Sequence, residues 1–311
     1  MSFPASAGHP VYSENYIPTP VFSKTFLARF YAASVAWDIC NTDYEKEVKT
    51  MGETVTIRQF PDVTVRNYTK GMTLVPESPN ADPITFAVDK GKYFDITVDD
   101  VDELQSGNIM GKNFFVTGNE QMKNSIDTDI LQGIYASADT YNCGTTAGYK
   151  TQAIDLGTTG APEPISKSNI ADYIAYCSIV LDERDVPDDG NRFIVLPSSA
   201  KGILLMSDLN NASMTGDGKS IYLNGKINDN YCGFKVYVSN NLKTVAETTG
   251  TSYYIPFGHK MSLAMATQLT KTRVIENDPA RLGTYYQAFQ IYGYKVVKDT
   301  AFGILYARFT M

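Results

Sequence analysis

The sequence has few of the residues that enzymes most often use for catalysis. Among its 311 residues there are only two histidines, His9 and His259, and four cysteines that lie far apart and form no C-x-x-C pair. Serine is common, but no serine lies in a G-x-S-x-G turn. Two distant histidines and scattered cysteines match no known zinc spacing. We therefore expect no catalytic, cofactor or metal site. These absences favour a structural role without naming one.

The sequence also lacks long apolar runs and long runs of one charge. No stretch approaches the ~18 apolar residues of a membrane span, and residues 1–22 lack the basic and apolar regions of a secretory signal. The formal net charge is −7, and Lys and Arg form no basic stripe. Such a chain has no general attraction to the phosphates of nucleic acid. We expect a soluble protein made in a cytoplasm, with reduced and mostly buried thiols and no membrane partner.

Three local features resemble functional sites only weakly. The run Gly218-Lys219-Ser220 imitates the end of a phosphate loop, but Ser213 stands where that motif needs a glycine. The acidic run 99–103 could bind a cation weakly, although such a run is more often a solvated turn or the start of a helix. His259 would have to carry any histidine-based catalysis alone; its ordinary role would be that of an exposed or capping residue.

The first forty residues predict an arm followed by a short helix. Residues 1–22 are rich in Pro, Ser, Tyr and Gly and show no period, which indicates an extended arm. An arm of this kind gains order by lying on another surface. The spacing of Phe26, Phe30, Ala33 and Trp37 then predicts a short amphipathic helix.

Residues 53–98 predict a long, strongly polar β-hairpin. Alternating runs lie on either side of a loop at 69–83, and the later run is divided by a turn at Lys90-Gly91-Lys92. Thr and charged residues occupy both faces of the strands. A hairpin with so little apolar surface is marginal alone, so we expect it to lean on another chain.

The middle of the chain predicts helices that alternate with buried strands. The longest helix is expected at 118–139, with Asn119 as its N-cap and an apolar residue at every fourth position: Met122, Ile126, Ile130, Ile134 and Ala138. A second helix follows Ser168 or Asn169, with the buried stripe Ile170, Ile174, Cys177 and Leu181. A buried strand at 192–196 and a short helix ending at Met206 come next.

The last third of the chain predicts mainly strands. Residues 233–241 and 252–257 read as strands, 259–267 as a helix, and 272–309 as a closing antiparallel sheet. The expected fold class is therefore α+β.

Three segments of the chain have distinctive patterns. The first is SNIADYIAYCSIVLDERDVPDDGNRFIVLPSSAKGILL, with its D-x-x-x-VP and R-x-x-VLP patterns; the others are CGFKVYVSNNL and GHKMSLAMATQLTKTRVIEN. Together with the order of the elements, these segments resemble the tailed-bacteriophage major capsid family. The fold that this resemblance implies is called Hong-Kong-97-like. Its parts would be an N-terminal arm (1–50), an extended E-loop hairpin (51–97), a P domain with a spine helix (98–141), an A domain (142–262) and a return to the P domain (263–311).

The resemblance implies a coat protein that catalyses nothing and binds no cofactor. Such a protein would assemble with itself into hexamers and pentamers of an icosahedral phage head around double-stranded DNA, which it would hold without tight or specific binding. It would be made in the host bacterial cytoplasm. A separate scaffolding protein (or none), a portal and decoration proteins would be its other partners.

Six charged residues are the candidates for contacts between subunits. Arg58, Arg66 and Lys70 lie on the predicted hairpin and could meet carboxylates of a neighbour. A loop of mixed charge carries Glu276, Asp278 and Arg281 and could meet its own copies around a three-fold axis.

Three alternatives remain open from the sequence. A phage tail or baseplate protein would also lack catalytic residues, although the long helix disfavours it. An encapsulin nanocompartment shell would share the fold. A hydrolase would have to use His259 with a distant serine, and a His259→Ala change would then abolish its activity while leaving a coat protein's assembly nearly intact.

Overall fold

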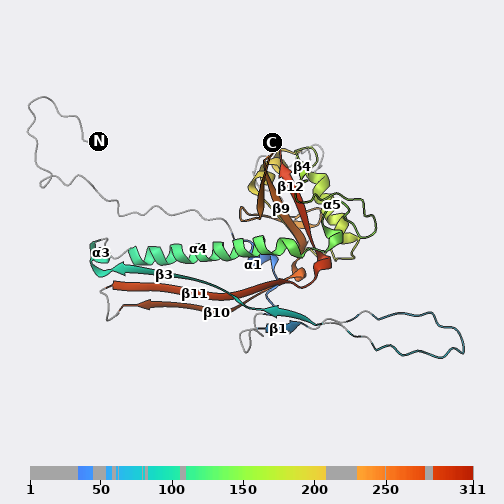
Figure 1. The fold of residues 1–311 in the computed structure, drawn as a ribbon, viewed down its shortest axis with the longest axis horizontal. Coiled ribbons are helices and arrows are strands. Elements are labelled where there is room, and N and C mark those ends of the chain that lie inside the picture. The colour runs from blue at the N-terminus through green and yellow to red at the C-terminus, as the bar shows by residue number, and fades with distance from the viewer. Residues whose placement is uncertain are drawn as a thin grey trace, which may run out of the picture. The chain divides into compact units, whose positions relative to one another are not determined.

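The computed structural model describes residues 34–44, 54–57, 61, 63–78, 80, 83–105, 110–207, 230–248, 250–276 and 283–310. In these residues the strands form three sheets (Figure 1). The two-stranded sheet pairs β1 (Thr54–Ile57) with β2 (Ile84–Ala87). The three-stranded sheet has the order β10 (Leu263–Ile275), β11 (Gly283–Val296), β3 (Lys90–Asp99).

The third sheet has seven strands. Its order is β4 (Glu163–Ile165), β12 (Phe302–Phe309), β9 (Gly250–His259), β5 (Arg192–Leu196), β7 (Phe234–Val238), β6 (Asn230–Tyr231), with β8 (Thr244–Glu247) paired to β9. Helices α5 (Ile170–Asp182) and α6 (Ser198–Met206) contribute to the same apolar core as this sheet. The predicted α+β class is confirmed.

The long helix α4 (Met110–Gly133) lies along one face of the three-stranded sheet (Figure 1). It continues into a 3-10 turn, η1 (Ile134–Ser137). The predicted stripe is confirmed, because Met122, Ile126 and Ile130 are all buried. The predicted start is wrong, since Asn119 lies inside the helix and not at its N-cap.

Glycines explain why the first turns of α4 are not obvious from the sequence. Gly111 and Gly118 lower the intrinsic preference for helix by about 1 kcal/mol each. In the fold, a Cβ added to Gly118 would lie 2.9 Å from the ring of Phe94, and one on Gly111 would collide with Tyr286. The helix therefore approaches the sheet closely at these positions, and this packing outweighs the unfavourable propensity.

A buried arginine connects α5 to β5. Arg192 is 1% exposed, and its guanidinium donates hydrogen bonds to Asp182 Oδ1 (2.6 Å), to the Pro187 carbonyl (3.2 Å) and to the Val186 carbonyl. Asp182, Val186 and Pro187 make up the D-x-x-x-VP pattern, and Arg192 opens R-x-x-VLP. The two patterns are therefore one packing unit. The predicted bounds of β5 and the buried stripe of α5 are both confirmed.

The predicted hairpin 53–98 is only partly correct. Residues 54–57 and 84–87 do pair in antiparallel register. There is no turn at Lys90-Gly91-Lys92, where β3 begins instead, and β3 pairs along its whole length with β11, almost two hundred residues later. Alternation indicates a strand but does not identify its partner, which explains the error.

Two predictions for the last third of the chain are wrong. Residues 259–267 do not form a helix: a single 3-10 turn, η4 (Lys260–Ser262), leads directly into β10. Residues 272–309 do not form one sheet, because a second 3-10 turn, η5 (Asp299–Ala301), takes the chain from β11 to β12 in the seven-stranded sheet. Ala264, Met265 and Ala266 suit a helix, but burial in the sheet decides their conformation.

The carboxylate of Asp127 on α4 fixes the start of α1 (Ala36–Ile39). It is fully buried and accepts hydrogen bonds from the amides of Val35 (2.7 Å) and Ala36 (2.8 Å). It also accepts from the Ser34 hydroxyl (3.3 Å) and the Asn241 carboxamide (2.8 Å). Hydrogen bonds to a charged group contribute about 1.5–3 kcal/mol each. Three distant segments therefore meet at one acceptor.

The apolar face predicted for the helix at 22–40 is wrong where it can be compared. Trp37 is 37% exposed, whereas Val35, Ala36 and Ile39 are buried. The hydrogen bonds to Asp127 orient α1 in this way. Phe26, Phe30 and Ala33 lie outside the described residues, as does the arm at 1–22.

We expect a Gly133→Ala change to lower the free energy of unfolding by about 1–3 kcal/mol, the usual cost of overpacking. A Cβ on Gly133 would lie 2.8 Å from Cζ of Tyr294. That ring is held in place because its hydroxyl is bonded to Lys90 (2.7 Å) and to the Asp129 carbonyl (3.0 Å). Chemical denaturation of the unassembled chain measures the change.

Gly202→Ala is the matched control, because Gly202 lies in α6 with nothing within 4 Å of an added Cβ. This change should stabilise the chain by up to about 1 kcal/mol through helix propensity. Equal effects of the two changes would contradict the close packing of α4 on the sheet.

Candidate functional site

Residues 63–78 form an exposed ribbon between β1 and β2, which extends beyond that strand pair (Figure 1). The ribbon turns at its tip, where the Met72 amide donates to the Thr69 carbonyl (3.1 Å). Its two arms run side by side, joined by a hydrogen bond from the Thr64 hydroxyl to Glu77 (3.0 Å). Every residue of the ribbon is exposed, and none belongs to a strand.

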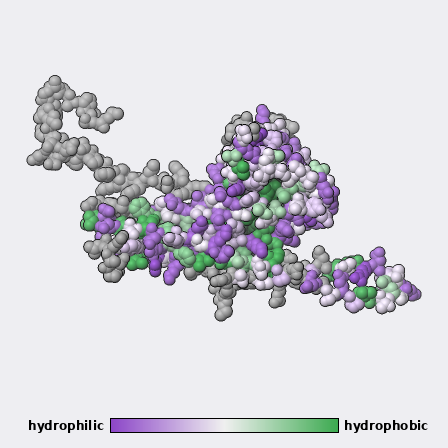
Figure 2. Space-filling view, in the orientation of Figure 1, coloured by the Kyte–Doolittle hydropathy of each residue, from purple (hydrophilic) through white to green (hydrophobic). Residues whose placement is uncertain are grey.

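The ribbon exposes large apolar side chains, which is unusual for a polar loop. Hydrophobic residues are visible on its surface in Figure 2. Val65 is 95% exposed and Leu74 72%, and the others are Val63, Tyr68, Met72 and Val75. The sequence prediction emphasised the polar character of this region, and the alternation of Val63 with Val65 was its one sign of an apolar face. Exposed apolar residues gathered on one segment indicate a binding surface.

The six predicted contact residues do not form one cluster in the described chain. Arg66 and Lys70 both belong to the ribbon and are exposed. Glu276 is exposed immediately after β10. Arg58, Asp278 and Arg281 lie outside the described residues.

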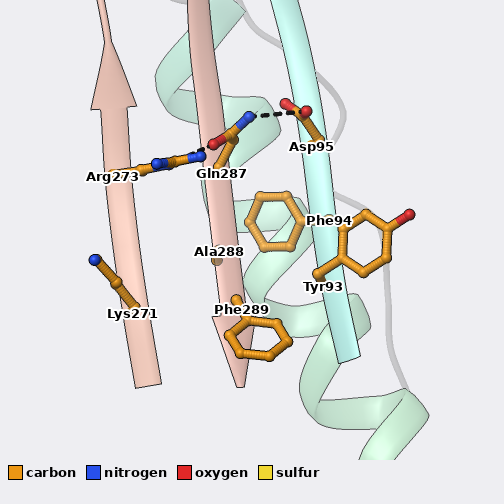
Figure 3. A pocket seen from close by; sticks show the side chains of 8 residues that line it. All are labelled: Tyr93, Phe94, Asp95, Lys271, Arg273, Gln287, Ala288 and Phe289. Carbon is orange, nitrogen blue, oxygen red and sulfur yellow. Dashed lines mark hydrogen bonds between the residues drawn. The ribbon is translucent and has the colours of Figure 1, made fainter. Parts of the chain in front are cut away.

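A second candidate surface is the face of the three-stranded sheet that carries Tyr93 and Phe289. These rings are 77% and 36% exposed, and they lie opposite each other on neighbouring strands (Figure 3). Between β3, β11 and β10 there is a groove of about 410 Å³. Its lining is Tyr93, Phe94, Asp95, Lys271, Arg273, Gln287, Ala288 and Phe289.

A row of hydrogen bonds orders the polar part of this groove. Arg273 Nε donates to Gln287 Oε1 (2.5 Å), and Gln287 Nε2 donates to Asp95 Oδ2 (2.9 Å) (Figure 3). Each residue comes from a different strand, so only the strand register brings them together. The groove thus combines two exposed rings with fixed charges of both signs. No local pattern in the sequence reveals it.

A third exposed apolar cluster lies where α3 (Asp100–Gln105) precedes α4. Val101 is 59% exposed, Leu104 75% and Phe114 40%. The acidic run begins a helix, which is one of the alternatives that the sequence left open, and Asp99 accepts the Val101 amide (3.0 Å). The apolar residues of this cluster were not predicted as a contact surface.

His259 has a structural role in the described fold. It is buried, so the predicted exposure is wrong, but the predicted capping is confirmed because Nδ1 accepts the Met261 amide (3.2 Å). Its Nε2 lies 3.0 Å from Asp189 Oδ1. Hydrogen bonds from the Asn191 side chain and from His259 hold the pKa of Asp189 well below its usual range. Neither of these two hydrogen-bond partners is a serine or a cysteine.

The cysteines are not activated nucleophiles. Burial, with a further effect of the Asp127 charge, raises the pKa of Cys40 to about 12. Burial also raises the pKa values of Cys143, Cys177 and Cys232. A reactive cysteine needs a lowered pKa. All four are free thiols, and Cys40 and Cys177 are buried, as expected.

Within the described residues, no group of His, Cys, Asp and Glu is arranged to hold a metal ion. The helices of the same residues include none that is long and apolar enough to cross a membrane.

Comparison with known proteins identifies the class to which this fold belongs. A family model described as "Phage capsid protein" matches residues 45–293, which is most of the chain. No curated protein sequence matches. The chain belongs to the phage capsid protein family, and the resemblance noted in the sequence is confirmed. It is a major capsid protein, and both family and fold point to a structural role.

Solved phage structures share the fold. The structure titled "Mycobacterium phage Che8" is 22% identical with a TM-score of 0.73, covering 96% of this chain and 98% of that one. The capsid of cyanophage P-SCSP1u is 14% identical with a TM-score of 0.72, covering 100% of both chains. The mature capsid of bacteriophage PhiM1 is 16% identical with a TM-score of 0.65, covering 94% and 91%. The expected Hong-Kong-97-like fold is confirmed, and these matches do not favour the tail, baseplate or nanocompartment alternatives.

The thiols should react with a maleimide in the order of their exposure. We expect Cys232 of the native, unassembled chain to be labelled first, because it is the exposed thiol. Cys143 should react more slowly, and Cys40 and Cys177 only after unfolding, because both are buried. Mass spectrometry of labelled peptides follows each site. Rapid labelling of Cys177 in the native chain would contradict the core described above.

Proposed function

We propose that this capsid protein assembles with copies of itself into the hexamers and pentamers of an icosahedral phage head that encloses double-stranded DNA, and that it catalyses no reaction. The observation that carries the proposal is the ribbon, residues 63–78, whose apolar side chains are all exposed in the single chain. Fully burying one Val or Leu side chain contributes about 1.5–3 kcal/mol. Burial of these side chains against a partner would therefore make binding of the ribbon favourable.

The ribbon is proposed to bind in the groove on the three-stranded sheet of another copy of the chain. Apolar side chains of the ribbon would cover the exposed rings of Tyr93 and Phe289. Arg66 and Lys70 of the ribbon would form ion pairs with Asp95 in the groove. Glu77 of the ribbon would pair with the groove's basic residues, Lys271 and Arg273. Contacts of moderate strength suffice, because each subunit of a shell is held on several sides at once.

The mixed-charge loop at 276–281 is proposed to meet its own copies around a three-fold axis. Glu276 is exposed at the end of β10. The exposed apolar residues Val101 and Leu104 of α3 supply a further surface of the kind that such a contact needs.

The division into arm, E-loop, P domain and A domain is part of the proposal, with one change from the sequence prediction. Lys90–Asp99 is assigned to the P domain because it pairs with β11, so the E-loop ends near residue 89. The protein would be made in the host bacterial cytoplasm and reside in the phage head. Scaffolding, portal and decoration proteins would be its partners. The net charge of −7 supports confinement of DNA without tight binding.

A Leu74→Asp change should impair assembly without unfolding the chain. Leu74 is 72% exposed, so the folded subunit loses no buried contact. Loss of about 2 kcal/mol per contact would weaken each by more than tenfold. Negative-stain electron microscopy should show closed shells for the wild type. Sedimentation should show mainly free subunits or small oligomers for the variant.

Thr73→Asp is the matched control, since it adds the same charge at the neighbouring exposed position without removing an apolar side chain. It should still assemble. The proposal fails if Leu74→Asp forms shells at the wild-type protein concentration, or if the wild-type chain stays a compact monomer at high concentration.

A further inference from the structure

The crossing between the two large sheets is built around His259. The chain leaves the seven-stranded sheet at His259, makes the turn η4, and enters the three-stranded sheet at Leu263. The return crossing from β11 to β12 is hydrogen-bonded to the same turn. The Ser262 carbonyl accepts the amides of Val297 (2.8 Å) and Lys298 (3.3 Å). Both crossings therefore share one small hydrogen-bonded unit.

Both ring nitrogens of His259 are used, and each holds a different segment. Nδ1 accepts the Met261 amide of η4 at 3.2 Å. Because Nδ1 is an acceptor there, the proton of the neutral ring lies on Nε2, which donates to Asp189 Oδ1 at 3.0 Å. In addition, the Ser262 hydroxyl donates to the His259 carbonyl (2.7 Å). The side chain of His259 is 5% exposed and that of Asp189 is 47% exposed, so the ring is shielded from water while its carboxylate partner is open to it.

Protonation changes the two contacts in opposite directions. An imidazolium donates from both nitrogens, so Nδ1 can no longer accept the Met261 amide. The contact with Asp189 becomes an ion pair and is strengthened. Protonation of His259 thus draws the ring towards Asp189 in the 188–191 loop. It also removes the hydrogen bond from the Met261 amide to Nδ1, which caps η4. Histidine is the side chain whose charge changes between pH 5 and 8.

The charged groups around the ring are of both signs: the carboxylates favour an imidazolium and the cations oppose it. Asp189 faces Nε2 directly. Asp43 and Lys260 line the same small groove as His259. Arg192 is its neighbour in the sheet register, but the guanidinium is bound to Asp182 and to main-chain carbonyls. Lys298 and Asp299 belong to the return crossing that η4 contacts.

We propose that His259 is a proton-operated latch, which when neutral caps η4 by accepting the Met261 amide and when protonated gives up that hydrogen bond. The latch lies in η4, the segment of chain that connects β9 of the seven-stranded sheet to β10 of the three-stranded sheet. Mild acid would loosen this crossing locally while both sheets remain folded. The inference concerns the single chain and does not depend on the proposed assembly.

Hydrogen–deuterium exchange of the full-length chain tests the latch. The readout is the protection factor of the Met261 amide, corrected for the intrinsic pH dependence of exchange and measured between pH 7.5 and 5. In the wild type, protection should fall about five- to tenfold, which is the effect expected from the loss of one hydrogen bond. The β5 amides should keep their protection across the same range.

His259→Asn is the key variant, because its Oδ1 can accept the amide two residues later but cannot be protonated in this range. Its Met261 protection should not change with pH. Asp189→Asn removes the carboxylate that favours the imidazolium and should move the midpoint of the response to lower pH. His9→Asn removes the only other histidine in the sequence and should change nothing.

Three outcomes would overturn the latch: a pH-independent protection factor in the wild type, an unchanged fall in His259→Asn, or loss of the response in His9→Asn. Should His259→Asn fail to fold, the Asp189→Asn midpoint decides, and a midpoint at the wild-type pH rejects the proposal.

Discussion

The buried carboxylate of Asp127 is the interaction on which the arrangement of three distant segments depends. A carboxylate is tolerated in an apolar interior only where hydrogen-bond donors replace its water. Here the donors are two amides at the start of α1, a serine hydroxyl and the Asn241 side chain. If either donor segment, residues 34–36 or Asn241, were removed, the buried carboxylate would lose hydrogen bonds that replace its water. The Asp127 carboxylate therefore positions the long helix, the start of α1 and the chain after β7 relative to one another.

In the interior of this chain the buried polar groups have hydrogen-bond partners, whereas on its surface large apolar side chains are left uncovered. This contrast fits a protein that assembles with copies of itself. Inside, polar groups such as Arg192 and Asp127 are buried because each has several partners. Outside, the ribbon and the sheet face expose Val65, Leu74 and Tyr93, which a monomer would be expected to bury. Apolar surface left uncovered in one chain is surface that another chain can cover. A shell built from identical subunits uses this arrangement.

The quality of prediction from sequence varied with the range of the interactions involved. Local pattern was sufficient for α5 and β5, where the apolar stripe and the tertiary burial agree. It failed at the start of α4, where Gly118 looks unfavourable until the ring of Phe94 is placed against it. It failed also for the partner of β3, which lies almost two hundred residues away. On the exposed ribbon, the sequence prediction singled out the charged residues Arg66 and Lys70 and did not single out apolar residues such as Leu74.

The amino-acid sequence by itself determined the class of the fold, the helices with a clear period and the family. These depend on composition, on spacing and on motifs that can be read along the chain. The tertiary structure alone decided which strands pair, which face of each sheet is left open, and that His259 joins two segments. The reason is physical: a period shows which side of an element is apolar, whereas its partner is chosen by how distant segments close around a shared core.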